Sequence, residues 1–228
     1  MNKNSKVIYE EVLLPLYTKL QNNDIVEVRG SKTVELLNKT LTFTCEDKGL
    51  INIKDIFVTS PDYVNAEFKW YDSMEPHITK ISNHAKMWGM VCDENGMVNS
   101  NYGYLIGSPQ NGHQYRNVLK QLIADPMSRR AVMYYSNPMI HYTGGKDHVC
   151  TIYVSYTMRD NKLHAFVSMR SSDIRFGVIG ADLAWQIRTL NRLAFDLGVK
   201  SGNVHWHAVS LHIYERHFDK LKEICNEA

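Results

Sequence analysis

The sequence predicts an α+β fold, because its strand-like segments cluster late in the chain and do not alternate strictly with helical segments. Segments rich in β-branched and aromatic residues occupy 131–135, 150–159, 163–170 and 204–214, and such composition is typical of strands. A long amphipathic segment over 182–197 separates the last two. Helices placed irregularly among strands are typical of this fold class.

The N-terminal half is predicted to begin with a helix and a strand pair. Apolar residues at helical spacing predict a helix over 7–20, with a kink at Pro15, which has no backbone N–H to donate. Two strands are expected within 25–45, on either side of the sequence Arg29-Gly30-Ser31-Lys32. Residues 62–73 are predicted to form a second helix with apolar residues on one side.

The second half is predicted to contain three further helices. Apolar spacing predicts one over 113–124, and Asp125-Pro126 ends it. The helix over 182–197 presents an apolar stripe and ends at Gly198, its expected C-terminal cap. A last helix is expected over 215–225. Because no repeat, low-complexity tract or linker interrupts the chain, residues 1–228 are expected to form a single domain.

The composition predicts a soluble, cytoplasmic globular protein. Of the 228 residues, 44% are hydrophobic and 22% are charged, and the net charge is +2. These values give no case for direct nucleic-acid binding or membrane-surface binding. The four cysteines form no C-x-x-C pair, which favours free thiols in a reducing compartment. The charged N-terminus does not resemble a signal peptide, and no apolar run approaches the length of a membrane span.

The stretch 169–186 is the most informative part of the chain. Arg170 and Ser171 follow a predicted strand and combine a planar guanidinium with a rotatable hydroxyl, which suits a phosphate. A glycine-rich bend then leads to Asp182 at the start of the long helix. A solvated turn followed by an N-capping Asp182 explains the same pattern, so the residues alone leave both interpretations open.

Cys150 and the pair Arg129-Arg130 each have a structural and a functional interpretation. Free cysteine commonly packs as a small hydrophobe. Cys150 would be a nucleophile if a positive neighbour such as Arg170 favoured its thiolate. Arg129 and Arg130 suit a solvated loop, or else a phosphate clamp that reaches across a dimer interface.

The C-terminal histidines suggest a metal site that their spacing does not support. His205 and His207 share one face of a predicted strand, but no cysteine or carboxylate completes a zinc pattern. No metal is therefore expected. His212 and Tyr214 also alternate onto one side of the strand, where an imidazole and a phenol suit a sugar hydroxyl.

Glu67 and Tyr102 carry little signal on their own. Glu67 lies in the middle of a predicted helix, where an exposed glutamate is the usual case. Tyr102 follows Asn99-Ser100-Asn101, a pattern that predicts a turn and then a strand.

Taken together, these elements resemble the thymidylate synthase superfamily, and within it the phage-type deoxycytidylate hydroxymethylases. The similarity runs from about Arg29 to Phe218, which is most of the chain. Each motif alone is weak, but all of them in this order are highly specific. The motifs are Asp125 to Arg130, Cys150, Met169 to Asp173 through Phe176-Gly177, Asp182 to Gln186, and Leu211 to Phe218.

The resemblance implies a thymidylate synthase-like α+β fold with a large twisted mixed sheet, flanking helices and a sheet-to-sheet homodimer. It implies that Cys150 is the nucleophile, that Glu67 organises proton transfer through water, and that Tyr102 lies near the pyrimidine C5. Asp173 and Gly177 would lie near the folate and the base. The implied nucleotide contacts are Arg170 and Ser171 at the phosphate, Arg129 and Arg130 donated across the dimer, Arg29 in a loop that is shorter than usual, and His212 and Tyr214 at the deoxyribose.

The position that reads the base departs from the synthase pattern. Synthases carry Asn in an Asn-Ile-Ala setting, where this chain has Asp182-Leu183-Ala184. Uracil presents N3–H as a donor and O4 as an acceptor, whereas cytosine presents the reverse. A carboxyl group can accept from N4 of cytosine and, with a shared proton, donate to N3. One extra residue stands between Gly177 and Asp182, so this assignment rests on the Asp-x-Ala-Trp-Gln anchor.

The resemblance therefore implies a deoxycytidylate 5-hydroxymethyltransferase that uses 5,10-methylenetetrahydrofolate as co-substrate. Cys150 would add to C6 of dCMP, and water would finally add to an exocyclic methylene at C5. Synthases usually place His after the nucleophile, where this chain has Thr151, and Trp88 and Thr151 are candidates for controlling that water. The alternatives are a dUMP hydroxymethylase, a thymidylate synthase, a CMP hydroxymethylase and an inactive nucleotide or RNA binder. The resemblance also suggests a phage that makes modified DNA in the cytoplasm of its host.

Overall fold

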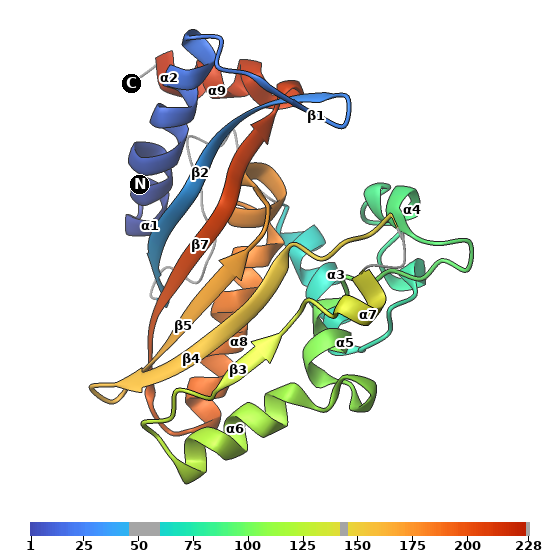
Figure 1. Ribbon diagram of the computed structural model, residues 1–228, viewed down its shortest axis with the longest axis vertical. Coiled ribbons are helices and arrows are strands. Elements are labelled where there is room, and N and C mark those ends of the chain that lie inside the picture. Colours follow the sequence, from blue (N-terminus) through green and yellow to red (C-terminus); the bar gives the residue numbers. More distant parts are fainter. Residues whose placement is uncertain (46–59, 142–145, 227–228) are drawn as a thin grey trace.

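The computed structural model describes residues 1–45, 60–141 and 146–226, and a seven-stranded sheet runs through its centre (Figure 1). The strand order is β1-β2-β7-β5-β4-β3, and β6 pairs with β7 beside β5. The strands are β1 (Val26–Val28), β2 (Ser31–Thr44), β3 (Val132–Tyr134), β4 (Thr151–Arg159), β5 (Lys162–Met169), β6 (Ser172–Asp173) and β7 (Lys200–Tyr214).

The sheet is mixed because one crossover joins two parallel strands. β5 and β7 run parallel, and α8 (Ala181–Asp196) lies in the connection between them. The other long pairs, β2 with β7 and β4 with β5, are antiparallel. Since β5 and β7 point the same way, the residues after β5 and those at the end of β7 reach the same end of the sheet. There Asp173 of β6 is paired with His212 of β7.

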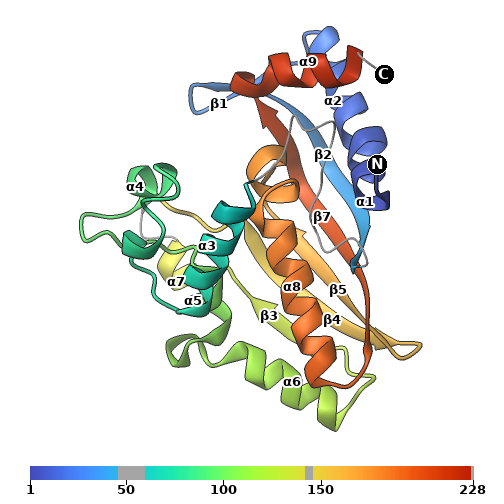
Figure 2. The same cartoon turned by 180° about the vertical axis from the view of Figure 1, so that it is seen from behind.

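The longest helix, α8, covers one face of the sheet (Figure 2). Its apolar stripe includes Leu183, Leu190 and Leu193, each fully buried. The spacing of these residues is that of one face of a helix. The helix ends as the sequence predicts, because Gly198 follows it with φ +69°, a conformation that glycine adopts without strain.

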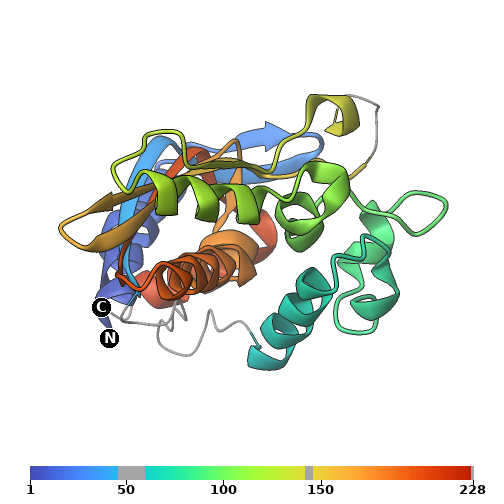
Figure 3. The same ribbon diagram turned by 90° about the horizontal axis from the view of Figure 1, so that it is seen from below.

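The remaining helices form two groups. At the β2 edge lie α1 (Lys3–Ile8), a π-helical turn (Tyr9–Leu13), α2 (Leu14–Gln21) and α9 (Phe218–Asn226). Beside α8 and β3 lie α3 (Pro61–Asp72), α4 (Met87–Val91), α5 (Tyr102–Gly107), α6 (Gln114–Ala124) and α7 (Pro138–His141) (Figure 3). Within the described residues, no helix combines the length and apolar character needed to cross a membrane.

The face of the sheet opposite α8 is uncovered over β4, β5 and β7 (Figure 1). Large apolar side chains are exposed there, among them Tyr153, Phe166 and Val209. The ring of Phe166 stacks on His205 of the neighbouring strand, with centroids 4.6 Å apart. An apolar surface of this kind is unusual for an isolated chain.

Most of the predicted elements are confirmed, with shifts of a few residues at their ends. One local prediction is wrong, and one of two open interpretations is excluded. Tyr102 begins helix α5 and not a strand, because the Asn101 side chain caps the helix by accepting from the Tyr104 N–H at 2.8 Å. Asp182 is not the N-cap of α8, since Gly180 occupies that position and Asp182 lies in the first turn. A π-helical turn precedes α2, and Pro15 lies in the first turn of α2.

Candidate active site

A cavity of about 610 Å³ is formed by the end of the sheet, α3, α4 and the turn between β1 and β2. This volume is typical of small-molecule sites. It gathers residues that are far apart in the sequence, and most of the predicted site residues are among them. Those that line it are Arg29, Glu67, Trp88, Tyr102, Cys150, Arg170, Ser171, Asp173, Gly177, Asp182 and Tyr214.

Cys150 lies immediately before β4, and Arg170 holds this segment in place from the end of β5. The Arg170 backbone N–H donates to the Cys150 carbonyl at 3.0 Å, and its Nε donates to the Val149 carbonyl at 2.9 Å. Its Nη2 lies 3.8 Å from the Cys150 sulfur. Burial raises the pKa of the Cys150 thiol to about 11, and the guanidinium of Arg170 opposes that rise. In this arrangement the thiol keeps its proton at neutral pH.

Glu67 is buried on α3, with only 4% of its surface exposed. Its Oε1 accepts a hydrogen bond from the Tyr71 hydroxyl at 2.7 Å, whereas Oε2 has no partner among the described residues. Burial raises the pKa of Glu67 to about 8, the hydroxyls of Tyr71 and Tyr63 oppose the rise, and the charge of Asp182 adds to it. The cavity therefore contains an acid that can hold or release a proton near neutral pH.

Tyr102 connects the Glu67 helix to the strand that follows Cys150. Its ring stacks on Tyr71, with centroids 5.3 Å apart and planes at 24°. Its hydroxyl accepts from Thr151 Oγ1 at 3.0 Å. Since Thr151 follows Cys150 directly, the contacts with Tyr71 and Thr151 fix the Tyr102 phenol near the thiol.

Asp182 lies in the first turn of α8, and Gly177 leaves its carboxyl uncovered. A Cβ atom at position 177 would lie 2.9 Å from Ser172 Oγ and 3.5 Å from Asp182 Oδ2. A π-helical turn over Ile174–Val178 precedes the helix. Burial raises the pKa of Asp182 to about 7, which the Tyr102 hydroxyl opposes and the charge of Asp173 reinforces.

Asp173 shapes the bend between β6 and α8. Its Oδ1 accepts from the backbone N–H groups of Arg175 and Phe176 at 2.6 and 3.0 Å. Its Oδ2 lies 3.8 Å from Arg216 Nη2. The Arg216 guanidinium also lies 4.5 Å from the ring centroid of Tyr214, so it joins the end of β7 to this bend.

Trp88 and Arg29 reach the cavity from its other sides. The Trp88 indole N–H donates to the Tyr63 hydroxyl at 3.2 Å, and the ring packs edge-on against Trp70. Arg29 lies in a two-residue hairpin turn, where it and Gly30 have φ values of +50° and +76°. Such angles are typical of the tight turns that match the twist of a hairpin.

Three predicted site residues do not line the cavity. His212 is buried behind it and contacts Tyr214 edge-on, with centroids 5.1 Å apart. Arg129 and Arg130 are exposed between α6 and β3. Within one chain, the cavity therefore lacks both of these arginines.

Two residues that build the site carry no local signal in the sequence. Tyr71 is fully packed and forms the hydrogen bond that fixes Glu67. Asp147 Oδ2 accepts from the Asn99 and Ser100 N–H groups, both at 2.8 Å, and from Ser100 Oγ at 2.7 Å. Asp147 thereby ties the segment before Cys150 to the start of α5. Neither role follows a motif, because each depends on partners brought together by the fold.

The part of the chain that the structure describes contains no candidate metal site. No group of three or more His, Cys, Asp or Glu side chains is placed there to hold a metal ion. The cavity instead offers one thiol, buried carboxyls, several arginines and aromatic rings.

Comparisons with known proteins identify the family. The family described as "Thymidylate synthase" matches residues 16–228. The deoxycytidylate 5-hydroxymethyltransferase of Enterobacteria phage T4 is 34% identical over 222 residues, or 92% of this chain and 87% of that protein. The deoxyuridylate hydroxymethyltransferase of Bacillus phage SP01 is 26% identical over 87% of this chain and 55% of that protein. A putative thymidylate synthase of Methanothermobacter marburgensis is 25% identical over 92% of both chains. On these matches, the chain belongs to the thymidylate synthase family.

Proposed function

We propose that this protein is a deoxycytidylate 5-hydroxymethyltransferase with 5,10-methylenetetrahydrofolate as its one-carbon donor. Its products would be 5-hydroxymethyl-dCMP and tetrahydrofolate. The observation that carries the proposal is the Asp182 carboxyl, which lines the same cavity as Cys150 and has a pKa of about 7. The activity named for the phage T4 relative supports the same substrate.

Asp182 is the proposed reader of the base. A carboxyl that is partly protonated at neutral pH can accept from the cytosine N4 amino group and share its proton with N3. The bare backbone at Gly177 leaves room for the ring beside Oδ2. A base with the opposite donor and acceptor pattern would leave buried polar groups unpaired, so discrimination by this contact is expected to be large.

Cys150 is the proposed nucleophile. Its sulfur would form a bond to C6 of the base, which makes C5 nucleophilic towards the one-carbon unit. The folate supplies that unit when it is bound. Tetrahydrofolate and the C5 proton would then leave, which breaks the bond between the folate nitrogen and the transferred carbon and gives an exocyclic methylene. Water would add to that methylene, and the Cys150–C6 bond would break to release the thiol. Because the thiol pKa is about 11 in the free chain, the first step requires additional positive charge near the sulfur.

Arg170 and Ser171 are the proposed phosphate contacts. Arg170 is held rigidly through its Nε and Nη2, so its guanidinium is preorganised for an anion. Arg29 lines the same cavity from the β1–β2 turn and is proposed as a third contact. Tyr214 lines the cavity and His212 supports its ring, an arrangement suited to the deoxyribose.

Arg129 and Arg130 are proposed to act in the cavity of a second copy of the chain. They are exposed and do not line their own cavity. The uncovered sheet face carries exposed Tyr153, Phe166 and Val209, an apolar surface that a sheet-to-sheet homodimer would cover. Such a dimer would bring positive charge towards the phosphate and the Cys150 thiol.

Glu67 is the proposed acid–base group. Tyr71 occupies Oε1, so Oε2 is the oxygen that can bind a water molecule or a substrate proton. Its pKa of about 8 suits proton transfer near neutral pH. Tyr102, held by Thr151, is proposed to act near C5.

The cavity residues fit a reduced folate on the side that faces α4 and the π-helical turn. Trp88 and Phe176 offer aromatic surface, and Gly177 offers close backbone approach. The Oδ2 of Asp173 accepts no hydrogen bond and is ion-paired with Arg216 at 3.8 Å, so it is proposed as an acceptor for a polar N–H of the pterin. These contacts are proposed to place the donor carbon above the nucleotide.

The experiment that tests the function incubates the protein with labelled 5,10-methylenetetrahydrofolate and dCMP, dUMP or CMP in separate reactions. We expect dCMP to give a 5-hydroxymethyl product, identified by mass, together with tetrahydrofolate. Formation of dihydrofolate with a methylated base would instead identify a synthase. The second candidate is hydroxymethylation of dUMP, which the similarity to the phage SP01 enzyme favours, and preferential turnover of dUMP would replace the first proposal.

A further inference from the structure

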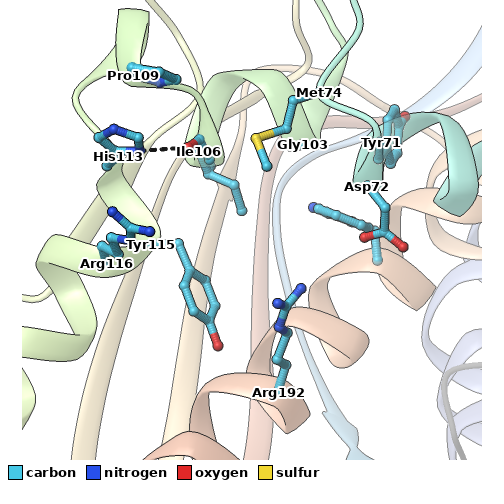
Figure 4. Close-up of a pocket in the computed structure, with 12 residues that line it drawn as sticks. Tyr71, Asp72, Met74, Gly103, Ile106, Pro109, His113, Tyr115, Arg116 and Arg192 are labelled. Atoms are coloured by element: carbon cyan, nitrogen blue, oxygen red, sulfur yellow. Dashed lines mark hydrogen bonds between the residues drawn. The ribbon is translucent and has the colours of Figure 1, made fainter.

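A second cavity, of about 340 Å³, lies between α3, α5, α6 and α8 (Figure 4). Its walls are largely aromatic and aliphatic, with contributions from Met74, Ile106, Tyr115 and Trp185. A cavity of about 150 Å³ is enough to hold a benzene ring. The second cavity therefore has room for an aromatic ring that carries a polar group.

Positive charge dominates the polar part of this cavity. Arg116 lines it from α6 and Arg192 from α8. Neither guanidinium forms an ion pair within the described part of the chain. The acidic Asp72 also lines the cavity, but both of its oxygens accept from Arg188, at 2.9 and 2.6 Å. Two arginines that form no ion pair within the described residues therefore line the cavity.

Arg192 points into the space between the helices (Figure 4). Its guanidinium carbon lies 5.4 Å from the ring centroid of Tyr115, and the Tyr115 hydroxyl donates to Asp196 Oδ2 at 2.7 Å. The ring contact holds the arginine beside the apolar wall without occupying its N–H groups. An anion on an aromatic ring would meet the guanidinium and the wall together.

We propose that this second cavity is a binding site for a small aromatic anion, a single ring that bears a carboxylate or a phosphate. The ring would pack between Ile106 and Trp185, and the anionic group would accept from Arg192, while Arg116, which lines the same cavity from α6, adds positive charge. A guanidinium and a planar oxyanion form paired hydrogen bonds. A neutral ring would gain only the apolar contact, and a cationic ring would be repelled.

The site adjoins the first cavity through Tyr71, which lines both. The helices that meet here are in backbone contact, since a Cβ atom at Gly103 would lie 1.7 Å from the Tyr71 carbonyl oxygen. An occupant would therefore touch the helices that carry Glu67 and Tyr102. The binding proposal itself does not depend on the activity assigned to the first cavity.

The test measures the binding of four ring probes to the full chain by ¹⁹F or ligand-observed NMR. The probes are 4-fluorobenzoate, phenyl phosphate, neutral 4-fluorobenzamide and cationic 4-fluorobenzylamine. We expect at least one anion to bind roughly tenfold more tightly than the amide, as charge-assisted hydrogen bonds predict. Arg116→Met and Arg192→Met should each weaken the binding of that anion about three- to tenfold. Arg192→Glu should reverse the order of affinities, so that the amine binds more tightly than the anion.

Two controls separate this site from other anion sites. Lys120→Met removes a positive charge from the same helix, one turn beyond Arg116, outside the lining, and should leave binding unchanged. Arg170 lines the first cavity, so Arg170→Met should also leave binding of the probe unchanged. Binding that falls with Arg170→Met but not with Arg116→Met or Arg192→Met would place the probe in the first cavity and overturn the proposal. Equal affinity for anion and amide would overturn it as well.

Discussion

The Tyr71 hydroxyl donates a 2.7 Å hydrogen bond to one oxygen of Glu67 and leaves the other oxygen without a partner among the described residues. The same tyrosine stacks on Tyr102, which is tied to Thr151 beside Cys150. One phenol thus orients the buried acid and supports the ring nearest the thiol. Glu67 lines the cavity in which proton transfer is proposed, so the effect of the Tyr71 hydrogen bond on Glu67 can be tested through activity.

Tyr71→Phe should shift the pH dependence of activity without dismantling the site. The ring and its stacking on Tyr102 remain, but Glu67 loses the hydroxyl that lowers its pKa against burial. The pKa of Glu67 should rise further, by about one unit for the loss of one hydrogen bond. The limb of the kcat/KM profile that reports Glu67 should move to higher pH.

Tyr104→Phe is the matched control, since Tyr104 lies two residues after Tyr102 and does not line the cavity. It should leave the profile in place. Identical profiles for Tyr71→Phe and the wild type would show that the hydrogen bond does not tune Glu67.

Glu67 should make the folded protein less stable as the pH rises. Its pKa is raised from 4.5 to about 8 in the folded state. Below pH 4.5 the carboxyl is protonated in both the folded and the unfolded chain. Between these values the folded chain keeps the proton that the unfolded chain loses, so the free energy of unfolding falls with pH and the full penalty is present above pH 8.

Glu67→Gln should remove that penalty. The free energy of unfolding of the variant minus that of the wild type should increase by roughly 2–4 kcal/mol from pH 4.5 to pH 9. Urea unfolding at both pH values measures this difference. Glu94→Gln, at an exposed position, controls for the loss of one charge. A stability difference that is the same at both pH values would contradict the raised pKa of Glu67.

The sequence predicts the elements whose signal is local. The apolar stripe of α8 and the glycine after it predict both the helix and its end, and the Arg29-Gly30 turn separates two strands as expected. The strand predicted at Tyr102 is wrong because Asn101 suits either a turn or a helix cap, and the burial of Leu105 and Ile106 against the core favours the helix.

The contacts within the site were less predictable than its members. Motifs in the sequence indicate Cys150, Arg170 and Asp182, and the structure brings them into one cavity. The hydrogen bonds of Asp147 join residues 47 and 48 positions apart, and no periodicity encodes such a pair. The burial of Glu67 likewise depends on α5 and α8 packing against α3.

The Cys150 thiol should react slowly with an alkylating reagent at neutral pH. The reactive form is the thiolate, and burial raises the thiol pKa to about 11. The rate of iodoacetamide modification of the Cys150 peptide, followed by mass spectrometry, should still be rising at pH 9. Arg170→Met should slow it further, because the guanidinium favours the thiolate. A rate that levels off below pH 8 would show that other charges already activate the thiol.

Arg129 should serve the cavity of a partner subunit. Arg129→Ala and Cys150→Ser should each lose most activity alone, since one lacks a phosphate contact and the other lacks the nucleophile. Mixing them under conditions of subunit exchange should restore activity, because one site in each heterodimer escapes both changes. The control mixes Lys120→Met with Cys150→Ser. Because Lys120→Met is expected to be active by itself, mixing should not raise the total activity above that of the Lys120→Met protein alone. Confirmed exchange without recovery would assign Arg129 to its own subunit or to the surface.

Asp182→Asn should change which base the enzyme prefers. The amide presents a fixed donor and acceptor, which match N3–H and O4 of uracil, whereas the partly protonated carboxyl of Asp182 matches cytosine. The ratio of kcat/KM for dCMP to that for dUMP should move towards dUMP by about 2–4 kcal/mol, the cost of mispairing one or two buried polar groups. The type of product should stay the same, because Asp182 reads the ring and does not govern the access of water to the exocyclic methylene. The variant should therefore form 5-hydroxymethyl-dUMP and tetrahydrofolate, identified by mass and by the absence of dihydrofolate. An unchanged dCMP to dUMP ratio would mean that Asp182 does not contact the base, and the proposed substrate would then lose its main support.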